Sequence, residues 1–242
     1  MTIEKITRAL CVPLALAALV LPAPARGAEA DVKLERVEID LADLPSLQSG
    51  ARTYVNLCLG CHAAGLVRYN TLLQLGLTEQ QVKDNLMFTT DKIGDYMRTA
   101  MQPADAREWF GVAPPDLSVA ARSRGADWLY TYLRGFYRDP ATLTGWNNTV
   151  FPNVGMPNVM WHLQGERIRK EEPVMRDGKE VGDGHGGVLK KVSFETVRPG
   201  TQTQDEFERT VRDLVNFMVW MGEPVQLKRK QLGLSCSSRS AS

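Results

Sequence analysis

Cys58-Leu59-Gly60-Cys61-His62 is the segment that says most about the fold and chemistry of this chain. A C-x-x-C-H pentad is typical of covalent haem attachment, in which two cysteine thiols add to the vinyl groups of the porphyrin. The histidine that follows supplies an imidazole to one face of the iron. The pentad therefore predicts one covalently bound haem c, with Cys58 and Cys61 as the thioether attachments and His62 as the first axial ligand.

Two other kinds of site use a C-x-x-C spacing. A redox dithiol of the thioredoxin type is expected near a βαβ pattern, and a structural zinc site needs a second Cys/His pair at close spacing. The chain shows neither pattern around the pentad. Its other cysteines are Cys11, in an apolar N-terminal run, and Cys236, in a polar tail. Both alternatives are therefore weaker than haem attachment.

The first thirty residues have the layout of a secretory signal peptide. Lys5 and Arg8 precede an uncharged run over residues 9–25, and Ala28 and Ala30 follow in an A-x-A arrangement. Prolines interrupt the run, whose unbroken apolar part is shorter than the ~20 residues of a spanning helix. We expect residues 1–30 to be a signal peptide, with the mature protein on the periplasmic side of the bacterial inner membrane.

Length and composition are those of one globular domain, since a domain typically has ~100 to 200 residues, and we expect the haem domain to span residues 31–227. This part holds 22 basic and 26 acidic residues, and the tail over 228–242 is basic and then rich in serine. A mildly acidic electron carrier attracts a basic partner. The chain carries no nucleic-acid signature and no phosphate-binding glycine motif.

Helical patterns alternate with long irregular stretches, which predicts a mainly α fold. Thr78 and Gln81 form a capping box before one amphipathic run, and Thr203 and Glu206 form another before a longer run that ends at Gly222. Two further helical segments are a run that stops at Gly60 and a face after Asp127 that contains Trp128, Leu129, Tyr132, Leu133 and Phe136.

Residues 138–200 are rich in Gly, Pro and Asn, and we expect them to form a long irregular insertion. Arg176-Asp177-Gly178-Lys179 is a typical hairpin turn, so this insertion has room for a small β-hairpin. The predicted architecture is a c-type cytochrome fold with long insertions of this kind.

The sixth ligand of the iron has several candidates. Met156 lies in a segment without helical period, where Gly155 lets the backbone approach a flat ligand and Pro157 stiffens the loop. Met160, His162 and His185 are the alternatives, and the residues alone leave all four open. Met87, Met218 and Met221 fall in helical segments and are predicted to fill the core.

Four segments together make the chain similar to the proteobacterial cytochromes c1, the haem-bearing subunits of cytochrome bc1 complexes. They spread from about residue 35 to about residue 230. The matching segments are Cys58–His62 with Arg68-Tyr69-Asn70, Ala113-Pro114-Pro115-Asp116-Leu117-Ser118 with Arg122-Ser123-Arg124-Gly125, Val154-Gly155-Met156-Pro157, and Phe217 to Pro224.

The resemblance implies roles for single residues. Met156 matches the second axial ligand of the family, and the pentad matches the first axial ligand and the two attachments. Arg124 matches an arginine that lies near a haem propionate, and Trp128 falls near an aromatic residue with a similar role. The spacing just after Arg124 differs from the mitochondrial form, and the other interpretations are a solvated charge at a helix end and a core aromatic.

The resemblance also implies a function: one electron passes from a Rieske iron–sulfur protein to a soluble cytochrome c, beside cytochrome b. Such a subunit catalyses no bond-making reaction alone. Ligation by histidine and methionine fills both axial positions and favours electron transfer. A free periplasmic electron shuttle is the first alternative, and a haem enzyme or gas sensor with an open sixth site is the second.

The tail departs from the family pattern. Cytochromes c1 continue after a basic stretch like Leu227-Lys228-Arg229-Lys230 into a transmembrane anchor. Residues 231–242 are too few and too polar to cross ~30 Å of hydrocarbon. A shifted reading frame, a truncated product and a soluble variant are all compatible with this tail.

Overall fold

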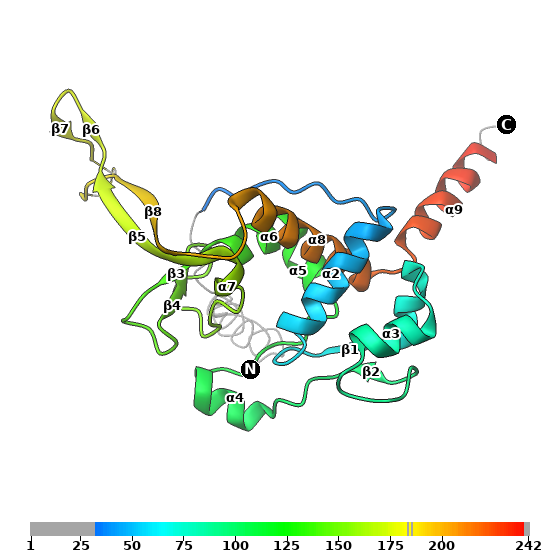
Figure 1. The fold of residues 1–242 in the computed structure, drawn as a ribbon. Helices are drawn as coiled ribbons and strands as arrows, with labels where there is room; N and C mark the ends of the chain where they lie inside the picture. Colours follow the sequence, from blue (N-terminus) through cyan, green and yellow to red (C-terminus); the bar gives the residue numbers. More distant parts are fainter. Residues whose placement is uncertain (1–31, 183, 185, 240–242) are drawn as a thin grey trace, which may run out of the picture.

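The computed structural model describes residues 32–239 except 183 and 185, so the predicted signal peptide lies outside the described residues. The fold is mainly helical, as predicted, with the helices around one core and two projections from it (Figure 1). In chain order the helices are α2 (Leu44–Leu57), η1 (Tyr69–Leu75, a 3-10 helix), α3 (Glu79–Leu86), α4 (Pro103–Phe110), α5 (Ala120–Arg124), α6 (Ala126–Arg134), α7 (Trp161–Gln164), α8 (Gln204–Gly222) and α9 (Gln226–Arg239).

The two capping boxes form as predicted. Thr78 precedes α3 and Thr203 precedes α8, and in each case the hydroxyl accepts from the backbone N–H three residues later while that residue's side chain accepts from the cap N–H. Each box satisfies two of the backbone donors that a helix start leaves unpaired. The two helix starts are thus fixed by local chemistry.

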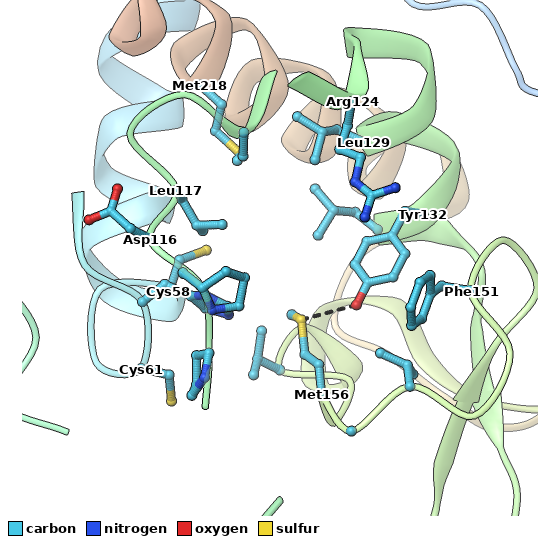
Figure 2. A pocket seen from close by; sticks show the side chains of 18 of the residues that line it. Cys58, Cys61, Asp116, Leu117, Arg124, Leu129, Tyr132, Phe151, Met156 and Met218 are labelled. Carbon is cyan, nitrogen blue, oxygen red and sulfur yellow. Dashed lines mark hydrogen bonds between the residues drawn. The ribbon is translucent and has the colours of Figure 1, made fainter. Parts of the chain in front are cut away.

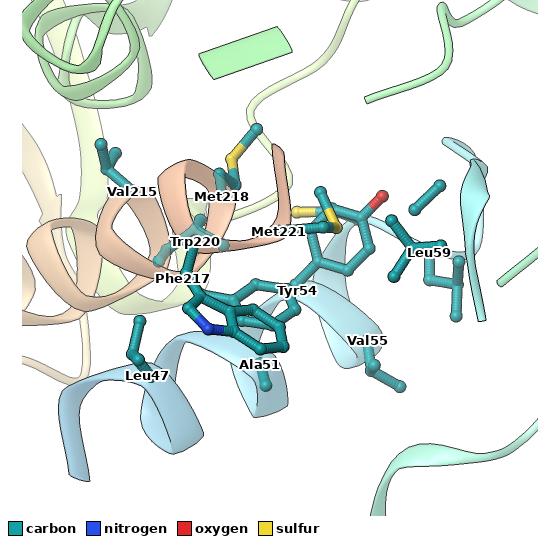
Figure 3. Packing of buried hydrophobic residues seen from close by; sticks show 14 of the residues in the cluster. Leu47, Ala51, Tyr54, Val55, Leu59, Val215, Phe217, Met218, Trp220 and Met221 are labelled. Carbon is teal, nitrogen blue, oxygen red and sulfur yellow. The ribbon is translucent and has the colours of Figure 1, made fainter. Parts of the chain in front are cut away.

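Helices α2 and α8 pack against each other and form the centre of the core (Figure 3). Tyr54 from α2 meets Phe217 from α8 with ring centroids 5.7 Å apart, and Phe217 also stacks on Trp220. A Cβ added to Gly50 would lie 2.0 Å from the backbone oxygen of Asp213. The two helix backbones therefore touch at Gly50, which no larger residue would permit.

A polar cluster ties the start of α2 to α8. Ser46 donates its hydroxyl proton to the Asp213 carboxylate at 2.8 Å. Asn216 donates through its amide to the backbone oxygen of Asp40 at 2.8 Å and to the Ser46 hydroxyl at 3.1 Å. Because buried polar groups stabilise only in matching positions, this cluster sets the register of the two helices.

Helix α6 begins at Ala126, and Phe136 lies beyond its end, in a strand. Asp127, expected just before the helical face, is inside the helix and accepts from the backbone N–H of Val37 at 2.9 Å. The predicted helical face therefore extends two residues beyond the end of α6 at Arg134. Phe136 is buried like the apolar residues of the helix, although it lies in a strand.

The prediction that residues 138–200 are irregular is wrong in part. A four-stranded sheet has the strand order β4-β3-β5-β8, and its two long strands leave the body as a projecting arm (Figure 1). The predicted hairpin turn is present at the tip, where Asp177 and Gly178 have φ values of 52° and 72°. The strands are β1 (Ala64–Arg68), β2 (Tyr96–Met97), β3 (Phe136–Arg138), β4 (Trp146–Asn148), β5 (Gly165–Pro173), β6 (Met175–Arg176), β7 (Lys179–Glu180) and β8 (Lys190–Pro199).

The arm escaped prediction because β5 has a single large apolar residue, Ile168, and so lacks the apolar alternation that marks a half-buried strand. Charged side chains cover it, and they pair across and along the strands, as in Lys190 with Glu171 and Arg198 with Glu166, each at 3.0 Å. Within the described residues, none of the helices combines the length and apolar character needed to cross a lipid bilayer.

Replacing Gly50 by alanine tests the contact between α2 and α8. We expect Gly50→Ala to lower the free energy of unfolding by about 3 kcal/mol, because the added methyl group forces the helices apart. Gly94→Ala is the control, since a Cβ there meets nothing within 4 Å, and its effect should stay within about 0.5 kcal/mol. Urea denaturation followed by circular dichroism measures both; equal stabilities would contradict the contact.

Candidate functional site

The C-x-x-C-H pentad closes the end of α2. Cys58 is the C-terminal cap of this helix, and its backbone N–H donates to the carbonyl of Tyr54 at 2.8 Å. The backbone N–H of His62 donates to the carbonyl of Cys58 at 2.8 Å, and the Thr99 hydroxyl donates to the carbonyl of Gly60 at 2.7 Å. These bonds place Cys58, Cys61 and His62 on one wall of a common cavity.

The imidazole of His62 is buried and oriented by a single hydrogen bond. Its Nδ1 lies 2.8 Å from the backbone oxygen of Pro115. A carbonyl can only accept, so Nδ1 carries the proton and Nε2 is left with a lone pair. Burial lowers the pKa of His62, although the bond to Pro115 opposes this effect. A neutral imidazole with a free Nε2 is the form that binds a metal.

The turn that carries Pro115 is fixed by Asp116. Its carboxylate accepts from the backbone N–H of Gly65 at 2.7 Å and from that of Ser118 at 2.8 Å. Partial burial tends to raise the pKa of Asp116, but hydrogen bonds from Ser118 and Gly65 outweigh it and the pKa is lowered. The Ser118 hydroxyl in turn accepts from the N–H of Leu66 at 3.0 Å. The residues after the pentad and the proline-rich turn are thereby locked together.

The two thiols are not held as thiolates. Burial, together with the neighbouring Cys61, raises the pKa of Cys58 to about 12, and burial raises the pKa of Cys61. The thiolate is the nucleophile of redox dithiols and the ligand of zinc sites. This environment therefore favours neither of those alternatives, whereas thioether formation leaves sulfur uncharged.

The opposite wall is a loop without regular structure that carries Met156. Asn147 and Asn148, at the end of β4, hold it: the side-chain oxygen of Asn148 accepts from the N–H of Val150 at 2.9 Å, and that of Asn147 accepts from the N–H of Asn153 at 2.8 Å. Both asparagines are buried. The loop is thus positioned by side-chain amides that replace the backbone partners a strand or helix would give.

Gly155 lines the cavity and also permits a close contact within the protein. A Cβ at this position would lie 2.6 Å from the backbone oxygen of Phe110 and 2.8 Å from the Val112 side chain. The glycine therefore permits close approach to the segment after α4. Its small size serves the packing of the loop against protein.

A cavity of about 520 Å³ separates the two walls, with Cys58 and Cys61 on one side and Met156 on the other (Figure 2). A volume of this size suits a bound cofactor, and apolar lining suits a flat macrocycle. The apolar lining comes from Leu57, Phe110, Leu117, Leu129, Leu133, Phe151, Val154, Leu214 and Met218. A haem attached to the pentad fits between these walls.

Arg124 and Trp128 line the same cavity. The guanidinium carbon of Arg124 lies 4.9 Å from the centroid of the Trp128 ring, in a cation–π contact. The indole Nε1 of Trp128 is buried and makes no hydrogen bond with any described residue. A buried donor of this kind needs an acceptor, and a haem carboxylate would supply one.

The rival ligands lie elsewhere. Met160 is buried in the hydrophobic core, and His162 is exposed on α7; neither lines the cavity. His185 lies outside the described residues. Met87, Met218 and Met221 are buried in the core as predicted, and Met218 also reaches the cavity wall.

Three residues that build the Met156 wall were not predicted from the sequence. Tyr132 was identified only as part of a helical face, and Asn147 and Asn148 were not singled out. Consecutive asparagines before an irregular segment were the available signal, since this side chain often satisfies turns. No feature of the sequence near either residue indicated that Tyr132 donates a hydrogen bond to Met156.

The sequence profile of the cytochrome c1 family matches residues 38–239. The chain belongs to the cytochrome c1 family. Cytochrome c1 of Allochromatium vinosum is 43% identical over 201 residues, which are 83% of this chain and 79% of that protein. A protein of Nitrosomonas europaea named ammonia monooxygenase gamma subunit is 45% identical over 222 residues, 92% of this chain and 87% of that protein.

Mitochondrial cytochrome c1 of Schizosaccharomyces pombe, named a heme protein, is 27% identical over 214 residues, which cover 79% of this chain and 60% of that protein. Membership of the family makes the chain an electron-transfer haem protein of the kind found in cytochrome bc1 complexes, with one covalently bound haem c. The cavity described above has the size and lining that such a group requires.

Replacing Asn148 by alanine tests the scaffold of the Met156 wall. We expect Asn148→Ala to lower the free energy of unfolding by about 3 kcal/mol, because buried backbone groups lose their partners. Asn85→Ala is the matched control, since Asn85 is exposed, and it should change stability by no more than about 0.5 kcal/mol. If both variants unfold at the same urea concentration, the amide scaffold is not a structural requirement.

Proposed function

We propose that this member of the cytochrome c1 family accepts one electron from a Rieske iron–sulfur protein and passes it to a soluble cytochrome c. The observation that carries the proposal is the cavity with a metal-competent imidazole, His62, on one wall and a thioether, Met156, on the other. Haem c supplies the one-electron ferric–ferrous couple.

The pentad residues have separate roles in the proposed site. Cys58 and Cys61 would form the two thioether bonds to the porphyrin. His62, held in place by the bond from Nδ1 to Pro115, would offer its Nε2 to the iron. Met156 would offer its sulfur from the opposite wall. The two walls would thereby fix the plane of the porphyrin from both faces.

Ligation of this kind favours electron transfer over reaction with small molecules. His62 and Met156 would fill both axial positions and keep oxygen or carbon monoxide off the metal. A soft thioether stabilises ferrous over ferric iron and raises the reduction potential above that of a two-histidine site. Two filled axial positions would disfavour a haem enzyme or a gas sensor, each of which needs an open position on the iron.

Arg124 and Trp128 are proposed to bind a haem propionate. The support is the unpaired, buried Nε1 of Trp128 and the cation stacked beside it. A carboxylate placed between them would accept from the indole and pair with the guanidinium.

Assembly beside cytochrome b, on the periplasmic side of the inner membrane, completes the proposal. Family membership and the similarity to a cytochrome c1 that covers most of both chains support it. The name of the Nitrosomonas relative suggests an ammonia-oxidising assembly instead, and a free periplasmic shuttle is the remaining alternative. These alternatives differ in partners while sharing the haem site.

Met156 and Met160 form a matched pair for testing the sixth ligand. In haem-loaded Met156→Ala we expect loss of the far-red absorption band that marks a thioether on ferric iron, together with binding of carbon monoxide by the ferrous form. Met160→Ala should keep the band and lose about 3 kcal/mol of stability, because Met160 is a core residue. Loss of the band in Met160→Ala and its retention in Met156→Ala would reverse the assignment.

Purification from separated membrane and soluble fractions tests the assembly. We expect the tagged full chain, expressed in its own host, to be recovered from detergent-solubilised membranes with cytochrome b and a Rieske protein. A haem-stained protein found only in the soluble fraction would support the free shuttle. Recovery with ammonia monooxygenase subunits would support the other assembly, and either result would contradict the proposal.

A further inference from the structure

Tyr132 directs its hydroxyl at the sulfur of Met156. The distance between Tyr132 Oη and Met156 Sδ is 3.3 Å, within hydrogen-bond range for sulfur, and the hydroxyl is the donor (Figure 2). Tyr132 comes from α6 and Met156 from the irregular loop, and both line the cavity. The sixth-ligand candidate therefore already has a protein partner on the side of α6.

Aromatic packing fixes the direction of the phenol. The ring of Tyr132 stacks on Trp128 with centroids 4.9 Å apart and planes 10° apart. On the other side it meets Phe136 edge-on, with centroids 5.2 Å apart. A ring held between two others loses little further freedom when its hydroxyl donates a hydrogen bond. The geometry is thus built into the end of α6.

Asn148 ties the donor and the acceptor into one unit. Its amide donates to the backbone oxygen of Tyr132 at 2.8 Å, while its side-chain oxygen accepts from Val150 at the start of the Met156 loop. Asn148 is 1% exposed. The loop and the end of α6 are therefore hydrogen-bonded to the same buried amide, which fixes the position of the phenol relative to the sulfur.

We propose that Tyr132 is a positioning residue that donates a hydrogen bond to the Met156 thioether and thereby raises the reduction potential of the haem. This inference rests on the proposed ligation by Met156. A thioether sulfur has two lone pairs, so it can bind a metal with one and accept a hydrogen bond with the other. The hydrogen bond draws electron density from the sulfur. Ferric iron relies on that density more than ferrous iron, so the reduced state gains.

The substitution Tyr132→Phe removes the donor and keeps the ring. Tyr130→Phe is the matched control, because Tyr130 is buried in the same helix, lies under the Arg134 guanidinium and does not line the cavity. Both variants are compared with the haem-loaded wild-type chain in potentiometric titrations. The far-red band of the ferric form reports in the same samples whether the thioether remains bound.

For Tyr132→Phe we expect the midpoint potential to fall with the band retained. The fall corresponds to a roughly threefold to tenfold shift toward the oxidised form in the electron-exchange equilibrium with a reference couple, the worth of one hydrogen bond. Tyr130→Phe should leave the midpoint unchanged. An unchanged or higher potential in Tyr132→Phe, or an equal fall in Tyr130→Phe, overturns the inference.

The same measurements separate this inference from the proposed function. A wild-type protein without the band lacks ligation by Met156, and then both proposals fail. A wild-type protein with the band, together with a Tyr132→Phe variant of wild-type potential, removes only the role of Tyr132.

Discussion

The direct backbone contact between α2 and α8 at Gly50 is the constraint on which the rest of the structure depends. Helix α2 ends at the pentad, so the position of α2 decides where Cys58 and His62 lie. Helix α8 also packs against α5, α6 and α7, which lead to the opposite wall. The elements that carry both walls therefore pack against the same helix, α8. The packing of Tyr54 against Phe217 thereby helps to set the distance between the two walls.

The two walls are held by different means. The His62 wall consists of a helix end and a turn locked by Asp116, whereas the Met156 wall is an irregular loop held by two buried asparagines. Amide side chains can hold an irregular backbone as firmly as a strand does, provided that every group is satisfied. A rigid pair of walls suits an electron carrier, since little rearrangement on each charge change keeps the transfer fast.

Local signals were read correctly from the sequence, and contacts between distant residues were not. The capping boxes at Thr78 and Thr203, the core methionines and the hairpin turn at Asp177 depend on neighbours within a few positions. The contact of Gly155 with Phe110 and the bond from Tyr132 to Met156 join segments that only folding brings together. The arm was not predicted because its charged strand β5 lacks the alternation of apolar and polar residues that marks a half-buried strand. The residues alone left four candidates for the sixth ligand of the iron, and the resemblance to cytochromes c1 singled out Met156 among them.

On the proposed ligation, several features of the site act on the reduction potential in the same direction. A sulfur ligand favours the ferrous state, and apolar walls disfavour the additional positive charge of the ferric state. The Tyr132 hydroxyl, which draws density from the sulfur, adds to the same effect. Two charged side chains also line the cavity, and they act in opposite directions: the Arg124 cation disfavours the ferric charge, whereas the Asp116 carboxylate favours it. The proposed transfer from an iron–sulfur protein needs a haem that accepts electrons readily, and the neutral groups of this site, the thioether, the apolar walls and the Tyr132 hydroxyl, all act in that direction.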